Sequence, residues 1–88
     1  MKLWLLQAKS KKGWLWKPWY DTMGGFVIRA KNESEARDLA QARGGDETRK
    51  TPQGESSNKA WLSSKYSTCI ELTLEGPAEV ILYDFNAA

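Results

Sequence analysis

One helix is predicted from the sequence, and its narrow apolar side limits what the rest of the chain can fold into. Asn32 is a suitable N-cap, and Glu35 follows three positions later at the spacing of a capping box. Gly44-Gly45 then ends the helix. The residues that repeat at the i, i+3, i+4, i+7 spacing are Ala36, Leu39, Ala40 and, through its aliphatic stem, Arg43. We therefore expect this small-residue stripe to pack on a sheet.

Four segments are predicted to be strands, at residues 2–8, 26–31, 68–74 and 79–85, the last because it is rich in Val80, Ile81, Leu82 and Tyr83. The first is apolar on both faces, which favours a central position, and with the second it is expected to form a hairpin with a long connection. In 68–74 the apolar residues share one face, which we expect to be the buried one. The order β-β-α-β-β predicts an α+β fold, with a mostly antiparallel four-stranded sheet and one helix on one face. The residues on the apolar face of 68–74 are Thr68, Ile70, Leu72 and Leu74.

Residues 46–59 are polar, contain Pro52 and Gly54 and carry no hydrophobic side chain. This composition predicts a mobile surface loop. The following Ala60-Trp61-Leu62 is expected to pack back against the body of the protein. No internal repeat is visible, so a single domain over residues 1–88 is predicted.

The composition argues against several classes of function. With 41% hydrophobic and 27% charged residues, the chain is typical of a globular protein. It has no apolar run near 18 residues, which favours a cytoplasmic protein without a membrane partner. Cys69 is the only cysteine and there is no histidine, so neither an internal disulfide nor a usual zinc site is expected. Ser63, Ser64, Ser67, Thr68 and Cys69 lie close together, but no histidine can activate them, and Lys65 shows no sign of desolvation. We predict no enzyme activity, no metal and no cofactor, and expect Cys69 to act as a small half-buried hydrophobe.

Charge changes sign along the chain. Residues 1–31 carry seven basic side chains against Asp21, a net charge of +6, whereas residues 66–88 carry four acidic side chains and no base. This asymmetry is typical of a basic binding face, or of terminal segments that lie side by side and neutralise each other. The sequence alone leaves both interpretations open.

Three of the five tryptophans lie within six positions, in the connection between the first two strands. Trp19, like Trp4 and Trp61, is expected to belong to the core. An exposed Trp14 or Trp16 would instead be typical of a protein-binding hot spot, or of a stacking platform for single-stranded nucleic acid. The candidate partner-binding residues are Lys11, Lys12, Trp14, Trp16 and Lys17.

Three segments carry a family resemblance: Lys-Leu-Trp-Leu-Leu at 2–6, Trp-Lys-Pro-Trp-Tyr-Asp at 16–21 leading to Gly-Phe-Val-Ile-Arg-Ala at 25–30, and Val-Ile-Leu-Tyr-Asp-Phe-Asn-Ala at 80–87. Together with Trp61-Leu62 and Ser67-Thr68-Cys69, they resemble a family of small proteins of unknown function from bacteriophages, prophages and bacterial genomes. The resemblance implies an accessory protein of a mobile element. Anti-CRISPR proteins are the best-known class of such inhibitors, and many that block DNA binding are acidic decoys. This chain is net basic, so steric binding to a protein subunit fits better.

The leading hypothesis is a non-enzymatic phage or prophage protein that inhibits a host defence complex, such as a CRISPR effector, by protein–protein contact. One alternative is a single-stranded nucleic-acid-binding module that uses the same residues. Another is a structural or dimerisation module. The oligomeric state, the strand order and the host partner stay open at this point.

Overall fold

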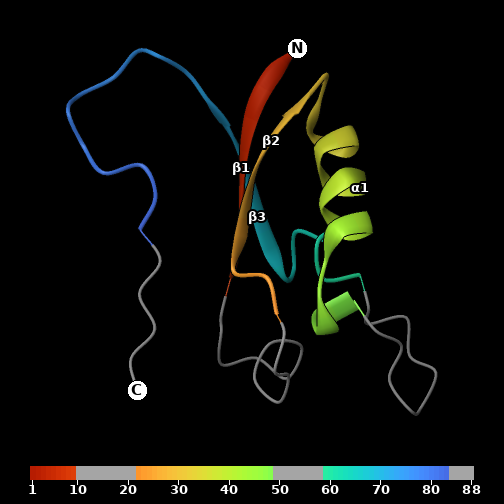
Figure 1. Ribbon diagram of the computed structural model, residues 1–88. Coiled ribbons are helices and arrows are strands. Elements are labelled where there is room, and N and C mark those ends of the chain that lie inside the picture. Colours follow the sequence, from red (N-terminus) through yellow and green to blue (C-terminus); the bar gives the residue numbers. More distant parts are fainter. Residues whose placement is uncertain (10–21, 49–58, 84–88) are drawn as a thin grey trace.

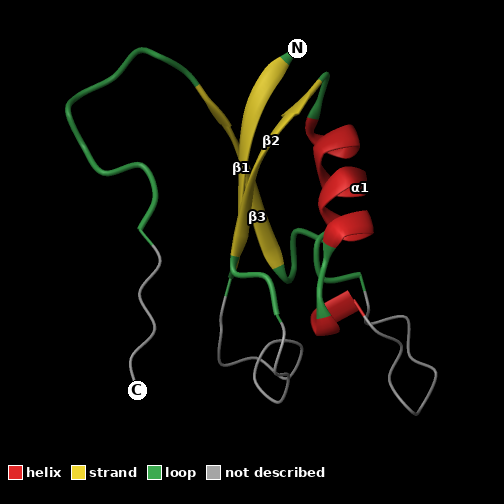
Figure 2. Cartoon of the chain, viewed as in Figure 1, coloured by secondary structure: helices red, strands yellow, loops and turns green. Residues whose placement is uncertain are grey.

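A central strand organises the sheet in the computed structural model, which describes residues 1–9, 22–48 and 59–83 (Figures 1 and 2). The elements in chain order are β1 (Lys2–Ala8), β2 (Gly25–Ala30), α1 (Glu33–Arg43), a short 3-10 helix (Asp46–Thr48) and β3 (Ser67–Leu72). The strands lie in the order β2-β1-β3, and both pairings are antiparallel. The α+β class, the central position of the first strand and its antiparallel pairing with the second are confirmed.

Strand β1 is central because both of its faces are apolar. Leu6 lies opposite Phe26 of β2 and Cys69 of β3, on the side that α1 covers. Leu5 points the other way and is also buried. At the start of β2 the backbones come close together, since a Cβ on Gly25 would lie 2.8 Å from the carbonyl oxygen of Leu6. Glycine is the only residue without a Cβ, so it suits this approach.

Helix α1 begins as the sequence predicts. The side chain of Asn32 accepts a hydrogen bond of 2.9 Å from the backbone N–H of Glu35. The carboxylate of Glu35 reaches back one residue beyond the cap and accepts from the N–H of Lys31 at 3.0 Å. Such caps contribute about 1 kcal/mol each. Gly44 follows the last helical residue, and its N–H donates to the carbonyl of Gln41.

The buried side of α1 differs from the predicted stripe at Leu39 and Arg43, which are both exposed. Ala36 and Ala40 are fully buried against the sheet, as expected. Leu39, however, is 46% exposed, and Arg37 is buried in its place. The helix lies close enough to the sheet that small side chains fill the contact, while Leu39 projects to solvent.

The core between α1 and the sheet depends on one large side chain. Trp61 is fully buried, and its ring meets that of Phe26 edge to face at a centroid distance of 4.9 Å. The predicted return of the segment after the loop is therefore confirmed for Ala60 and Trp61. Trp4 is half-buried against the same core, and Trp19 lies outside the described residues. The buried members of the core are Leu6, Ala30, Ala36, Ala40, Ala60 and Trp61.

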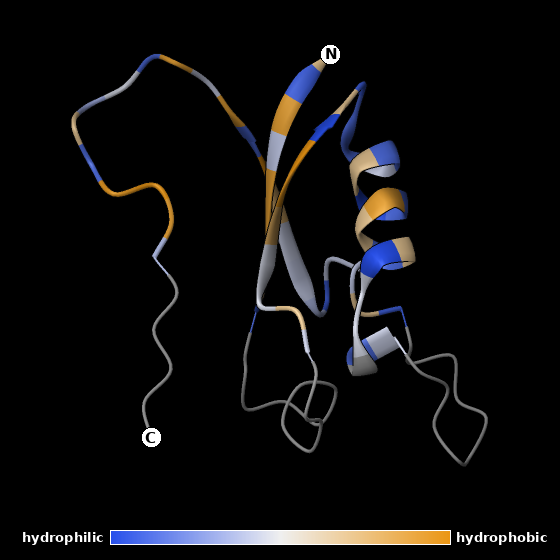
Figure 3. Cartoon of the chain, in the orientation of Figure 1, coloured by the Kyte–Doolittle hydropathy of each residue, from blue (hydrophilic) through white to orange (hydrophobic). Residues whose placement is uncertain are grey.

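The predicted fourth strand at 79–85 is not confirmed, because the described residues form a three-stranded sheet. Within 73–83 there is no strand, and 84–88 lie outside the described part. Gly76 has a φ of +139°, a conformation that favours glycine, and Pro77 follows it. The chain turns at the Gly-Pro pair, and residues 79–83 lie across a pocket from β3 without pairing with it. Figure 3 shows this segment as a hydrophobic stretch at a distance from the sheet.

The prediction for the face of β3 is wrong. The expected inward residues Ile70 and Leu74 are 53% and 106% exposed, and the strand ends at Leu72. Ser67 and Cys69 face α1 instead. Arg37 supplies the physical reason, because it donates to the hydroxyl and to the backbone carbonyl of Ser67 and so holds that residue against the helix. A strand has a period of two, so this contact turns Ile70 and Leu72 to the opposite face.

The predicted polar loop at 46–59 begins with structure of its own. Residues Asp46–Thr48 form a 3-10 turn, and Glu47 is almost completely buried. The rest of the loop, 49–58, lies outside the described residues. The prediction of a surface loop is therefore wrong at Glu47. This side chain can be buried because several N–H groups donate to its carboxylate.

Candidate interaction surface

The partner-binding residues predicted from sequence, namely Lys11, Lys12, Trp14, Trp16 and Lys17, lie outside the described residues. They fall in the sequence between Lys9 and Thr22, the described residues on either side. The structure does not test their role. The described residues nevertheless form a candidate interaction surface that was not predicted from the sequence.

This surface is the side of the sheet that faces away from α1, which we call the open face. Leu5 lies beneath its centre, buried at 2% exposure, opposite Val27 on one side and Ile70 on the other. Val27 and Ile70 are each 53% exposed, and Leu3 is partly exposed as well. No described residue forms a layer over this face comparable to α1 on the other side (Figure 2). The apolar residues of the open face are Leu3, Leu5, Val27, Ile70 and Leu72.

The charged side chains of the sheet are relevant to both interpretations of the charge gradient, namely a basic binding face and terminal segments that neutralise each other. Arg29 lies on the open face, opposite Leu3, and gives that face a basic side chain. On the other face Lys2 and Glu71 form an ion pair at 3.4 Å, between the basic first strand and the acidic third strand. The strands β1 and β3 of the two terminal segments therefore lie side by side. Both side chains of the pair are well exposed, so its contribution to stability is small.

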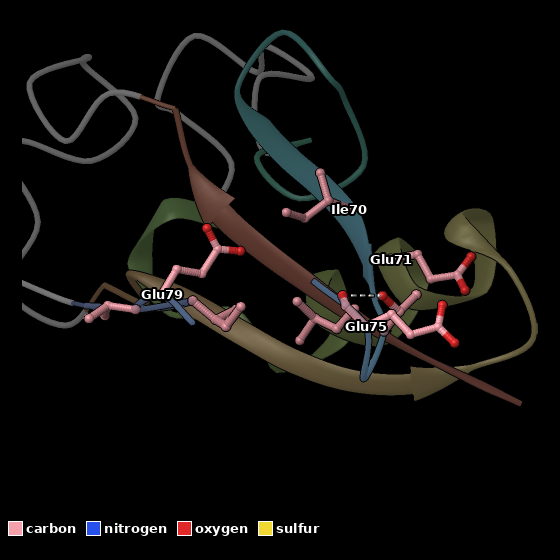
Figure 4. A pocket seen from close by; sticks show the side chains of 8 residues that line it. Ile70, Glu71, Glu75 and Glu79 are labelled. Atoms are coloured by element: carbon pink, nitrogen blue, oxygen red, sulfur yellow. Dashed lines mark hydrogen bonds between the residues drawn. The ribbon is translucent and has the colours of Figure 1, made fainter. Parts of the chain in front are cut away.

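A pocket of about 320 Å³ lies between β3 and the segment that follows it. Figure 4 shows Glu71 and Glu75 at one end of the pocket and Glu79 toward the other. At its turn, the Thr73 hydroxyl donates to the carbonyl of Glu75 at 3.2 Å. The lining residues are Ile70, Glu71, Leu72, Thr73, Glu75, Glu79, Val80 and Ile81. The chain thus turns back alongside β3 without forming a ladder with it.

The edge of β3 is a second feature of this region. In the order β2-β1-β3, the inner side of β3 pairs with β1. Among the described residues no strand pairs with its outer side. An unpaired edge leaves backbone N–H and C=O groups available to another strand.

Two buried polar groups were missed by the sequence interpretation. The Glu47 carboxylate accepts from the Trp61 indole N–H at 2.7 Å and from the backbone N–H groups of Gly45 and Met23 at 3.0 and 3.1 Å. Arg37 donates to the carbonyl of Trp61 and to Ser67. Every polar atom in these hydrogen bonds helps to hold the fold together, so we assign both groups a structural role.

The hydroxyl groups of Ser63 and Ser67 also take part in hydrogen bonds that hold the fold together. The Ser67 hydroxyl accepts from Arg37 at 2.9 Å and donates to the carbonyl of Ser63 at 3.3 Å. The Ser63 hydroxyl accepts from the backbone N–H of Lys65. Lys65 is exposed, with its ammonium 5.4 Å from the centre of the Tyr66 ring. Within the described part of the chain, these hydroxyl groups are hydrogen-bonded without a base that would activate them.

Cys69 is half-buried against the core, as predicted. Burial raises the pKa of its thiol above the ordinary value of 9.0, and the nearby Glu33 carboxylate raises that pKa further. Arg37 opposes the shift. The thiolate is the reactive form, so the folded protein holds Cys69 in its unreactive form at neutral pH.

Iodoacetamide is therefore expected to alkylate Cys69 more slowly in the folded protein than in the same protein unfolded in urea. The midpoint of the pH–rate curve is expected to lie above that of the unfolded chain, because folding disfavours the thiolate. Mass spectrometry of quenched samples measures both rates. The urea-unfolded protein is the internal control, and an equal or lower midpoint in the folded protein would contradict the prediction.

Comparisons with known proteins identify no family, because no protein-family model, curated sequence or solved structure matches this chain. Within residues 1–9, 22–48 and 59–83, no helix combines the length and apolarity needed to cross a membrane. The same residues bring together no group of three side chains suited to hold a metal ion.

Proposed function

We propose that this protein is a non-enzymatic accessory protein of a phage or prophage, and that it inhibits a host defence complex of the CRISPR-effector type by protein–protein contact. The observation that supports this proposal is the open face. It presents Leu3, Val27, Ile70 and Leu72 on the side of the sheet away from α1. Contiguous exposed apolar side chains on a small domain are typical of an interaction site.

The chemistry of the partner follows from the charges near this face. Arg29 lies among the apolar residues of the open face. The predicted partner-binding residues, which lie outside the described part of the chain, include three further lysines. We infer a partner surface with an apolar centre and carboxylates around it, because opposite charges at the rim favour association. The family resemblance leads us to place that surface on a protein subunit of the host complex.

A binding experiment with single substitutions tests this proposal. The protein is mixed with purified CRISPR effector complexes, and co-elution, affinity and target-DNA binding are measured. Val27→Lys is expected to weaken binding about tenfold or more, because it places a charge in an apolar contact. Val27→Asp is expected to weaken it further, since the new carboxylate would face the acidic rim of the partner.

Leu39→Lys is the matched control. Leu39 has an exposure similar to that of Val27 but lies on α1, away from the open face. Its substitution is expected to leave the affinity unchanged. If no effector complex binds the protein, the proposed inhibition is wrong. Tight binding of single-stranded oligonucleotide that weakens steeply with salt would favour the nucleic-acid alternative instead.

A further inference from the structure

The C-terminal segment at residues 79–83 and the free edge of β3 are complementary features of one chain. The segment contains Val80, Ile81, Leu82 and Tyr83, all of them exposed. Runs of β-branched, aromatic and aliphatic residues are typical of strands. This segment therefore has the composition of a strand but no neighbouring strand among the described residues. Its backbone N–H and C=O groups are left to bond with water.

The chain's own β3 is close, yet the segment does not pair with it. The connection over residues 73–78 is six residues long and contains Gly76 in a left-handed conformation, followed by Pro77. Tight hairpins use loops of two to five residues with matched turn geometry. Here the wider connection leaves the pocket of about 320 Å³ between β3 and residues 79–81. Paired strands lie about 4.8 Å apart, which leaves no room for such a space.

We propose that residues 79–83 pair with the edge of β3 in a second copy of this chain, so that two copies exchange their C-terminal segments. Each copy supplies the free edge of β3 and one unpaired segment, and a two-fold axis would satisfy both contacts at once. The six-residue connection serves as the hinge. The proposal goes beyond the proposed function, because it concerns the edge of β3 and not the open face.

The size of the contact is sufficient for a specific dimer. When the dimer forms, the four apolar side chains of each segment and the surface that they cover are buried. The total area removed from water in the two copies is on the order of 1,000 Å². The backbone hydrogen bonds of strand addition come in addition. The segment carries Glu79 and β3 carries Glu71, whose charge is offset in part by its ion pair with Lys2, so the apolar side chains and the backbone pairing, rather than charge, support the exchange.

Sedimentation velocity over a wide concentration range tests the oligomeric state. The protein is expected to form a dimer, and Ile81→Asp is expected to raise the dimer dissociation constant at least tenfold. Leu39→Asp is the matched control, because Leu39 is 46% exposed and Ile81 is 51% exposed, and it is expected to leave the dimer intact. A monomer at every concentration, or a dimer that Ile81→Asp does not weaken, would overturn the proposal.

A disulfide experiment separates exchange from closure on the same chain. In a Cys69→Ala background, one tagged protein carries Ile70→Cys, and a second carries either Ile81→Cys or Leu82→Cys, which covers both faces of the segment. Mixed and oxidised, the two proteins are expected to form a covalent heterodimer on a non-reducing gel. A chain that carries both cysteines and oxidises only to a monomer would show that the segment closes on its own β3 and would refute the exchange.

The two proposals can fail separately. Val27→Asp is expected to abolish host-complex binding and to leave the dimer intact, since Val27 lies on β2 at the far side of the sheet from β3. Ile81→Asp is expected to give a monomer that still binds the host complex through the open face.

Discussion

Alanine in place of Trp61 is expected to lower the free energy of unfolding by about 3–5 kcal/mol, which is the usual cost of truncating a buried aromatic side chain. A domain of this length has a total stability of roughly 4–13 kcal/mol, at about 0.05–0.15 kcal/mol per residue. The substitution therefore removes a large part of the stability, and a substantial fraction of the molecules is expected to be unfolded at 37 °C.

The large effect has two causes at one side chain. Trp61 is the only large aromatic in the fully buried core of the described residues, and its neighbours Ala36 and Ala40 are too small to fill the space that it would leave. Its indole N–H also donates to the buried carboxylate of Glu47 at 2.7 Å. Removal of Trp61 thus opens a cavity and takes a donor from a buried charge.

Trp61→Phe separates these two causes. Phenylalanine keeps most of the ring and its edge-to-face contact with Phe26 but removes the N–H, so Glu47 retains two backbone donors. We expect a smaller loss of about 1–3 kcal/mol, the cost of a buried acceptor that loses one partner. Urea titration followed by circular dichroism measures all three proteins. If Trp61→Ala costs less than Trp61→Phe, the packing argument is wrong.

The local part of the fold was predictable from the sequence. Helix α1 depends on residues that are near neighbours in the chain, namely Asn32, Glu35 and the glycines after Arg43. Strand β1 was correctly placed at the centre because both of its faces are apolar. In each case the information lies within a few residues, which is the range over which capping and periodicity act.

The face of β3 was not predictable in the same way. Its alternation gives two faces but does not say which one meets the helix. That choice depends on Arg37, which is 30 positions away from Ser67 in the chain. The apolar face consequently turned outward, and this single difference forms one side of the open face. Likewise, Glu47 lies in a polar stretch, and no local pattern marks it as the partner of Trp61.

The candidate interaction surface was also only partly predictable from the sequence. The residues predicted to bind a partner, such as Trp14 and Trp16, lie outside the described part, so that prediction stays untested. The open face had one signal in the sequence, because Leu3 and Leu5 form a second apolar face on β1 that a single helix cannot cover. A three-stranded sheet with one helix leaves that second face without a layer.

Arg37→Ala is expected to lower the free energy of unfolding by about 3–5 kcal/mol, the second large effect in this protein, because the buried oxygens of Trp61 and Ser67 lose this donor at about 1–3 kcal/mol for each group. The guanidinium of Arg37 donates to Glu33 at 2.8 Å, to the carbonyl of Trp61 at 3.0 Å, and to the hydroxyl and carbonyl of Ser67 at 2.9 and 3.1 Å. It thereby joins α1 to the segment before β3 and to the first residue of β3 itself. Alanine supplies none of these donors.

Arg43→Ala is the matched control for this prediction, because Arg43 lies on the same helix with its side chain exposed, and a change within about 0.5 kcal/mol is expected there. Arg37→Lys is expected to recover only part of the loss, since an ammonium cannot reproduce the planar set of donors that reaches Trp61 and Ser67 together. Chemical denaturation measures the three variants.

Arg37→Ala should also expose Ser67 and loosen the orientation of β3, because the contact that turns Ile70 toward the open face is lost. Hydrogen exchange at β3 tests this point. If the amides of Ile70 and Leu72, which face β1, stay as protected as in the parent protein under native conditions, Arg37 does not set the face of the strand.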